Sequence, residues 1–137
     1  LSQMRRYKRQ LTMSVLKIDN YENLIRTVGK ENCDDLTRKM AEILKQGLRD
    51  SDVLGVLYRD AVGIILPEID AHTAMIPILR LDGRLRQLPL LENNHLGWGL
   101  AEINGQVTHI DELVSHALDA AFEATRKLDE NVIIFGS

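Results

Sequence analysis

The segment VLYRDAVGIILP, from Val56 to Pro67, decides the fold because it indicates two short strands that meet at a two-residue tip. Apolar runs on either side of Arg59 and Asp60 are typical of paired strands. The tip itself is unusual, since two-residue hairpin turns favour Asn-Gly, Asp-Gly or a leading glycine, which accept positive φ angles. The segment therefore predicts a β-hairpin and raises the question of why an arginine stands at its tip.

Helical and β-compatible segments alternate on both sides of this hairpin. Asp19 or Asn20 can cap the first helix, and Gly29 can end it. Pro77 and Gly83 weaken the helical region that follows the hairpin. In chain order we expect a strand at 11–18, helices at 21–29 and from 34 to 48, hairpin strands at 52–58 and 61–67, a helix at 70–87, a strand at 94–103, a helix at 111–127 and a strand at 131–135.

This order contains the βαββαβ plan of ferredoxin-like folds, which is an α+β architecture. We expect a central, mainly antiparallel sheet flanked by helices that pack chiefly on one face. The length of 137 residues and an apolar content of 45% suit one domain over residues 1–137 with one core. Because the sequence begins with Leu1, we expect it to be the excised part of a larger signalling protein.

Charge and cysteine content limit the partners and the compartment. A net charge of −3 gives no general attraction to nucleic acid or anionic membranes, so no nucleic-acid partner is expected. The lone Cys33 cannot form an internal disulfide, and no apolar run approaches the roughly 18 residues that cross a bilayer. We therefore expect a cytoplasmic domain, which could belong to an inner-membrane protein. The histidines lack metal-ligand spacing, and Trp98 is expected in the core.

Four segments of the chain resemble the GGDEF domain of diguanylate cyclases. The resemblance covers almost the whole chain in order, spacing and apolar pattern, and it implies the GGDEF or nucleotidyl-cyclase type of the expected fold. The segments are SVLKIDNYENLIRTVGKENCDDLTRKMAEIL, LRDSDVLGVLYRDAVGIILP, GWGLAEI and DELVSHALDAAFEATRKLDENVIIF.

The resemblance places the five-residue GGDEF signature, counted back from Pro67, on the hairpin tip. Its glycines, which admit GTP in active members, are replaced by Tyr58 and Arg59. Its acidic residues serve metal binding and catalysis; Asp60 keeps one, and Ala61 removes the other. The degenerate signature is thus Tyr58, Arg59, Asp60, Ala61 and Val62.

Other catalytic positions of the family are also changed. The resemblance places the metal-binding aspartate on Lys17 and the guanine-reading asparagine on Ile25, while a guanine-reading aspartate matches Asp34. The lysine that supports the phosphates falls on Thr125. An ammonium group cannot bind Mg²⁺, which prefers oxygen ligands. The resemblance therefore implies a domain without cyclase activity, with no catalytic residue, metal or cofactor.

The motif Arg49-Asp50-Ser51-Asp52 matches the family's inhibitory RxxD site, which binds cyclic di-GMP. An arginine fork can bond a guanine edge or a phosphate, and a carboxylate can accept from guanine nitrogens. By the same resemblance, Arg80 or Arg84 from the helix after the hairpin completes the site. The alternative is a surface ion pair, and Arg126 to Asp129 is a second RxxD in the chain.

Taken together, these positions lead us to expect an inactive GGDEF-like receptor for cyclic di-GMP that signals to a protein partner or a neighbouring sensor domain. The chain also resembles the degenerate domain of the inner-membrane receptor for Pel polysaccharide secretion. The alternative is a structural or dimerising module that binds no nucleotide. A homodimer is compatible with both.

Overall fold

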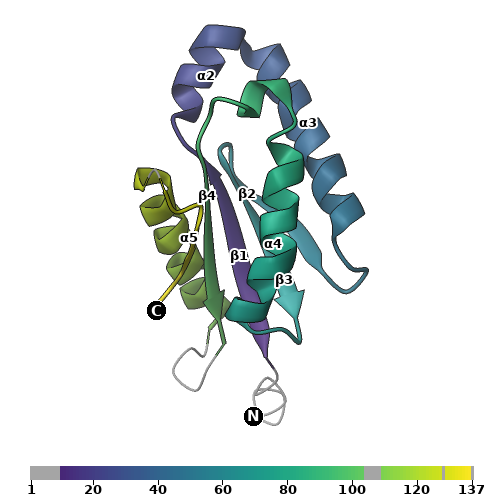
Figure 1. Ribbon diagram of the computed structural model, residues 1–137, viewed down its shortest axis with the longest axis vertical. Coiled ribbons are helices and arrows are strands. Elements are labelled where there is room, and N and C mark those ends of the chain that lie inside the picture. Colours follow the sequence, from purple (N-terminus) through teal and green to yellow (C-terminus); the bar gives the residue numbers. More distant parts are fainter. Residues whose placement is uncertain (1–9, 104–108, 128, 137) are drawn as a thin grey trace.

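A mixed sheet with strand order β2-β3-β1-β4-β5 forms the middle of the molecule (Figure 1). The structure, a computed structural model, describes residues 10–103, 109–127 and 129–136. Its elements are β1 (Leu11–Ile18), α2 (Tyr21–Val28), α3 (Lys30–Gly47), β2 (Val53–Tyr58), β3 (Ala61–Pro67), α4 (Ala71–Leu85), the short 3₁₀ helix η1 (Pro89–Leu91), β4 (Leu96–Glu102), α5 (Ile110–Arg126) and β5 (Val132–Ile134).

The central strand β1 is buried on both faces, as its apolar sequence predicts. It pairs antiparallel with β3 and with β4, so that Val15 lies opposite Gly63 on one side and Gly99 on the other. The strands β2 and β3 also pair antiparallel, whereas β4 and β5 pair parallel. The expected α+β architecture with a mainly antiparallel sheet is confirmed.

Helices cover the two faces of the sheet unequally. The larger core cluster packs α2, α3 and α4 against one face, where Leu16, Ile64 and Trp98 are buried. The smaller cluster packs α5 against the other face, next to Met13 and Val15. Figure 1 shows α3 and α4 side by side on one side of the strands and α5 on the opposite side. Packing chiefly on one face is therefore confirmed.

Two details at the helix ends differ from the expectation. The helix α3 begins at Lys30 rather than at Asp34, because Gly29, with φ of 89°, both ends α2 and caps α3. Asn20 caps α2 through a left-handed backbone, with φ of 56°, and its side chain makes no capping hydrogen bond.

The helix α4 continues through Pro77, and its first turn is capped by Asp70, which accepts a 2.7 Å bond from the Thr73 amide.

The hairpin tip has a backbone that explains how it tolerates Arg59 and Asp60. Among the described residues, only Asn20 and Glu68 have positive φ without being glycine, so the tip does not use the usual primed turn. Instead, the register between β2 and β3 shifts between Val56 and Tyr58. Such an irregularity increases the local twist of a strand pair. The Ile18 amide donates a 2.9 Å bond to the Asp60 carbonyl and fastens the tip to the end of β1.

Two further expectations concern single elements. Trp98 is completely buried, as expected, and its indole nitrogen donates a 3.0 Å hydrogen bond to the Asp82 carboxylate. Within the described ranges, none of the helices has both the length and the apolar character needed to span a membrane.

Candidate functional site

An ion pair joins the end of β1 to the hairpin tip. The Lys17 Nζ atom lies 2.8 Å from the Asp60 Oδ2 atom, and their side chains are 11% and 32% exposed. The same ammonium lies 4.7 Å from the centre of the Phe122 ring on α5. The cation therefore contacts both a carboxylate and an aromatic ring, each of which attracts positive charge.

This arrangement does not fit a Mg²⁺ ion. Lys17 offers no ligand oxygen, its charge is paired with the remaining carboxylate, and Ala61 is a buried methyl group. Across the described part of the chain, no three or more His, Cys, Asp or Glu side chains gather as a metal site.

Two hollows lie between the hairpin and the helices beside it. One, of about 230 Å³, lies between α3 and the hairpin. The other, of about 220 Å³, brings Ile25 and Asp34 together, the two positions that the resemblance assigns to guanine reading. Arg59 lines both hollows. The arginine at the hairpin tip therefore stands at the junction of the two hollows.

The polar groups around the second hollow are partly engaged. The Asp34 carboxylate lies 3.2 Å from the Lys30 ammonium in an exposed pair one turn apart on α3. Burial raises the pKa of the Tyr21 hydroxyl above its ordinary value. Ile25 offers only a half-buried apolar side chain.

Thr125, which the resemblance places where the family has its phosphate-supporting lysine, is packed inside the molecule. Its side chain lies against Gly97 of β4, and its hydroxyl donates a 2.7 Å bond to the Phe122 carbonyl. The residue is 8% exposed, so its hydroxyl is taken up within α5.

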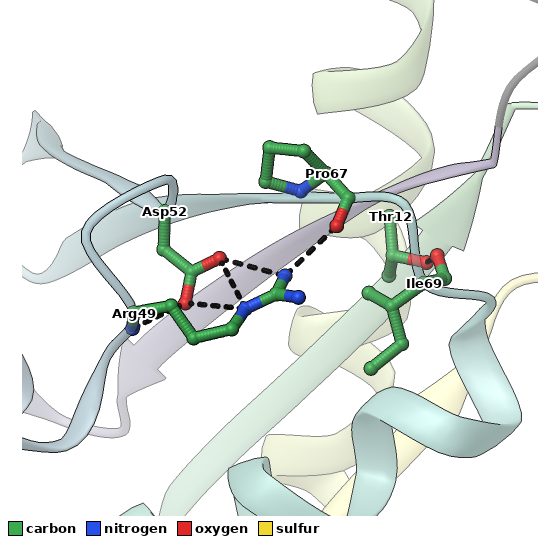
Figure 2. A network of polar contacts seen from close by, with 5 residues as sticks. All are labelled: Thr12, Arg49, Asp52, Pro67 and Ile69. Atoms are coloured by element: carbon green, nitrogen blue, oxygen red, sulfur yellow. Dashed lines mark hydrogen bonds and ion pairs between the residues drawn. The ribbon is translucent and has the colours of Figure 1, made fainter.

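At the opposite end of the hairpin, Arg49 and Asp52 are held together in the turn between α3 and β2 (Figure 2). The Arg49 Nη2 atom lies 2.9 Å from Asp52 Oδ1 and donates a second bond, of 2.8 Å, to the Pro67 carbonyl. The Arg49 backbone amide donates to Asp52 Oδ2 at 2.8 Å. The Asp52 side chain is 3% exposed, whereas that of Arg49 is 51% exposed. The carboxylate thus anchors an arginine that faces solvent.

Arg84 lies close to this turn, whereas Arg80 makes no contact with it among the residues that the structure describes. A Cβ atom at Gly47, two residues before Arg49, would lie 3.3 Å from the Arg84 Nη1 atom and would also overlap Leu81. The missing side chain of Gly47 therefore leaves room for the Arg84 guanidinium beside the end of α3. Arg80 is exposed one turn earlier on α4. Arg86 is directed inward, where its Nε atom donates a 2.8 Å bond to Asp82.

Comparison with known proteins identifies the family of this chain. The sequence profile of the family described as "Diguanylate cyclase, GGDEF domain" matches residues 1–131. The chain belongs to the GGDEF family. The GGDEF domain is 28% identical over 131 residues to the probable diguanylate cyclase DgcC of Escherichia coli K12, which covers 93% of this chain and 35% of DgcC. It thus spans about a third of that relative's length.

Solved structures share the fold of this GGDEF domain. The GGDEF domain of DgcB from Caulobacter crescentus, in complex with c-di-GMP, superposes with a TM-score of 0.87 at 15% identity, covering 99% of this chain and 84% of that one. The diguanylate cyclase SiaD from Pseudomonas aeruginosa, in complex with its activator SiaC, gives a TM-score of 0.85 at 17% identity, covering 97% and 53%. At these identities the likeness establishes the fold.

The two candidate regions of the GGDEF domain lie at opposite ends of β2. Arg49 and Asp52 precede this six-residue strand, and Arg59 and Asp60 follow it, which separates them by roughly 20 Å. The sequence alone did not indicate Phe122 as a neighbour of Lys17, nor Lys45 as a lining residue of the larger hollow. For both residues, helical spacing in α3 or α5 was the only available signal.

Proposed function

We propose that this GGDEF domain is a catalytically inactive receptor that binds cyclic di-GMP at Arg49 and Asp52. The observation that carries the proposal is a contrast between the two ends of β2. The Arg49–Asp52 pair is assembled, whereas the metal and substrate end holds the Lys17–Asp60 ion pair. A domain that keeps the recognition pair and replaces the metal ligands is suited to binding rather than to phosphoryl transfer.

The chemistry of the turn suits a guanine or phosphate ligand. Arg49 uses its Nε and Nη2 atoms within the protein, and its Nη1 atom has no partner among the described residues. Arg84 brings a second guanidinium to the same end of α3 through the space at Gly47. We assign Arg84 rather than Arg80 as the arginine that completes the site. Two guanidinium groups beside one anchored carboxylate can meet both the edge of a base and a phosphate.

The relatives support the ligand and the kind of partner. The DgcB GGDEF domain was solved in complex with c-di-GMP, and SiaD was solved with an activator protein. By extension, this domain passes ligand occupancy to a protein partner or a neighbouring sensor domain, and it acts in the cytoplasm. Its pattern of loss and retention also suits a degenerate receptor of the type that serves Pel polysaccharide secretion.

Calorimetric titration with cyclic di-GMP tests the receptor. We expect the wild-type chain to bind and Arg49→Ala to weaken binding by roughly tenfold to a hundredfold, because a hydrogen bond to a charged group is worth about 1.5–3 kcal/mol. Arg84→Ala should weaken binding and Arg80→Ala should not. Arg126→Ala, in the second RxxD, is the matched control. Absence of binding by the folded wild type would refute the receptor function.

Incubation with GTP and Mg²⁺ tests inactivity separately. We expect neither cyclic di-GMP nor a linear dinucleotide to form, because the position of the metal-binding aspartate carries the Lys17 ammonium. The products are detected by chromatography. Formation of either one would contradict the proposed lack of cyclase activity, and it would not bear on cyclic di-GMP binding at Arg49.

A purely structural or dimerising module is the second candidate. It is favoured by the extent to which Arg49, Asp52 and the Pro67 carbonyl already satisfy one another. In that case Arg49→Ala would lower the free energy of unfolding, and cyclic di-GMP would have no effect on the wild-type chain.

A further inference from the structure

The larger hollow, here called the α3–hairpin cleft, has mainly apolar walls. Its inner residues belong to the core that packs α3 on the sheet, and Val56 at its edge is 72% exposed. The apolar lining includes Met40, Ala41 and Leu44 from α3 and Leu54 and Val56 from β2. Small-molecule sites typically combine such an apolar lining with a few polar groups that fix orientation.

Cations dominate the charged groups of this cleft. Lys45 and Arg59 both line it, and neither has an ion pair or a side-chain hydrogen bond within the described ranges. Asp60 also lines the cleft, but its carboxylate is paired with Lys17 at 2.8 Å. The repulsion that a lone carboxylate would exert on an anion is therefore offset, and the remaining charge is positive.

The dimensions of the cleft limit the size of its ligand. A volume of about 230 Å³ corresponds to roughly eight groups the size of water, at ~30 Å³ each. Along α3, the lining residues run from Thr37 to Lys45, a rise of roughly 12 Å at ~1.5 Å per residue. An extended chain of about eight carbons suits both the volume and the length.

We propose that the α3–hairpin cleft binds a medium-chain aliphatic carboxylate, with its chain between α3 and β2 and its carboxylate on Arg59. The planar guanidinium can take a carboxylate with two parallel hydrogen bonds, which an ammonium cannot. Arg59 also lies at the junction of the two hollows, where the head group has access to solvent. The inference goes beyond cyclic di-GMP binding and does not depend on it.

Octanoate is the probe for this proposal, with octanol as the uncharged analogue. Calorimetry or NMR shift titration on the full chain should show octanoate binding more tightly than octanol. Hexanoate should bind more weakly, by roughly fourfold for each methylene removed. Arg59→Ala should weaken octanoate binding about tenfold, and Arg38→Ala, which removes an exposed arginine of α3 outside the cleft, should not.

A second variant tests whether octanoate binds in this cleft, and it leaves the charged residues unchanged. Ala41→Phe fills the cleft and should abolish octanoate binding, and its fold is checked by circular dichroism and by cyclic di-GMP binding at the other end of β2. Undiminished binding in Ala41→Phe, or equal binding of octanol, would overturn the proposal. If Lys45→Ala abolished octanoate binding and Arg59→Ala did not, the placement of the carboxylate on Arg59 would be overturned. GTP should not displace octanoate, and displacement by GTP would overturn the assignment of the cleft to an aliphatic carboxylate.

Discussion

Lys17 is the residue that most changes the chemistry of the hairpin end. Its ammonium lies beside Asp60, where the family resemblance places a metal ion held by two carboxylates. The positive charge at this place therefore comes from a side chain of the protein itself. The centre of the Phe122 ring lies 4.7 Å from the same ammonium. A single side chain of the protein can thus neutralise Asp60 without a bound ion.

Replacement of Lys17 tests this role in stability. Lys17→Ala leaves the partly buried Asp60 carboxylate without its partner, so we expect the free energy of unfolding to fall by about 1–2 kcal/mol. Urea denaturation monitored by circular dichroism measures it. Lys39→Ala removes an exposed lysine that pairs with Asp35 and should change stability by less than ~0.5 kcal/mol. Equal effects of the two variants would contradict a structural role for Lys17.

Contacts between single residues could be predicted from the sequence when the two partners were close in the chain. Arg49 and Asp52 are three residues apart, and their proximity followed from the spacing. Lys17 and Asp60 are 43 residues apart, and their contact depends on the register that places Lys17 opposite Ala61. No pattern within either segment encodes that register, so the ion pair was not predicted.

Elements with a clear apolar period were predicted nearly to the residue. β1 and β3 run over 11–18 and 61–67 as expected, because their apolar runs end at polar or proline residues. The start of α3 was missed because its first turn, from Lys30, is polar except for Cys33 and carries little helical periodicity. The hairpin was found from its two strands, whereas the irregularity that accommodates its tip lies in the pairing and has no local signal.

The packing of α5 on β4 depends on the glycines of that strand. A Cβ atom at Gly99 would overlap the backbone of Ala117 and Ala121, and backbone cannot rotate away as a side chain can. We expect Gly99→Ala to lower the free energy of unfolding by about 3 kcal/mol in a urea titration. Gly55→Ala is the matched control, since a Cβ atom there meets nothing within 4 Å. If both substitutions had the same small effect, the close approach of α5 would be refuted.

At the scale of the molecule, β2 and α3 connect the two candidate sites. Both elements reach from the Arg49–Asp52 turn to the hairpin tip, a separation of roughly 20 Å. β2 is an edge strand of the sheet, and α3 packs on one face of that sheet. The βαββαβ plan was predictable from the order of the elements, because the apolar runs of the strands and the helical spacing between them are visible in the sequence. The placement of the Arg49–Asp52 pair at one end of β2, the Lys17–Asp60 pair at the other end and the cleft along the strand emerged only from the three-dimensional arrangement.

Because one sheet joins the two ends, we expect the chain to unfold in a single transition and a ligand at either end to stabilise all of it. Cyclic di-GMP at a hundredfold excess over its Kd should raise the free energy of unfolding by about 2.7 kcal/mol, which corresponds to an increase in Tm on the order of 8 °C. Differential scanning calorimetry measures this shift. At the same ligand concentration the stabilisation should shrink to about 0.4–1.4 kcal/mol in Arg49→Ala, whose binding is tenfold to a hundredfold weaker. It should persist in full in Arg59→Ala, since Arg59 lies at the far end of β2. Two separate transitions, or loss of the shift in Arg59→Ala, would show that the two ends do not behave as distinct sites on one cooperative unit.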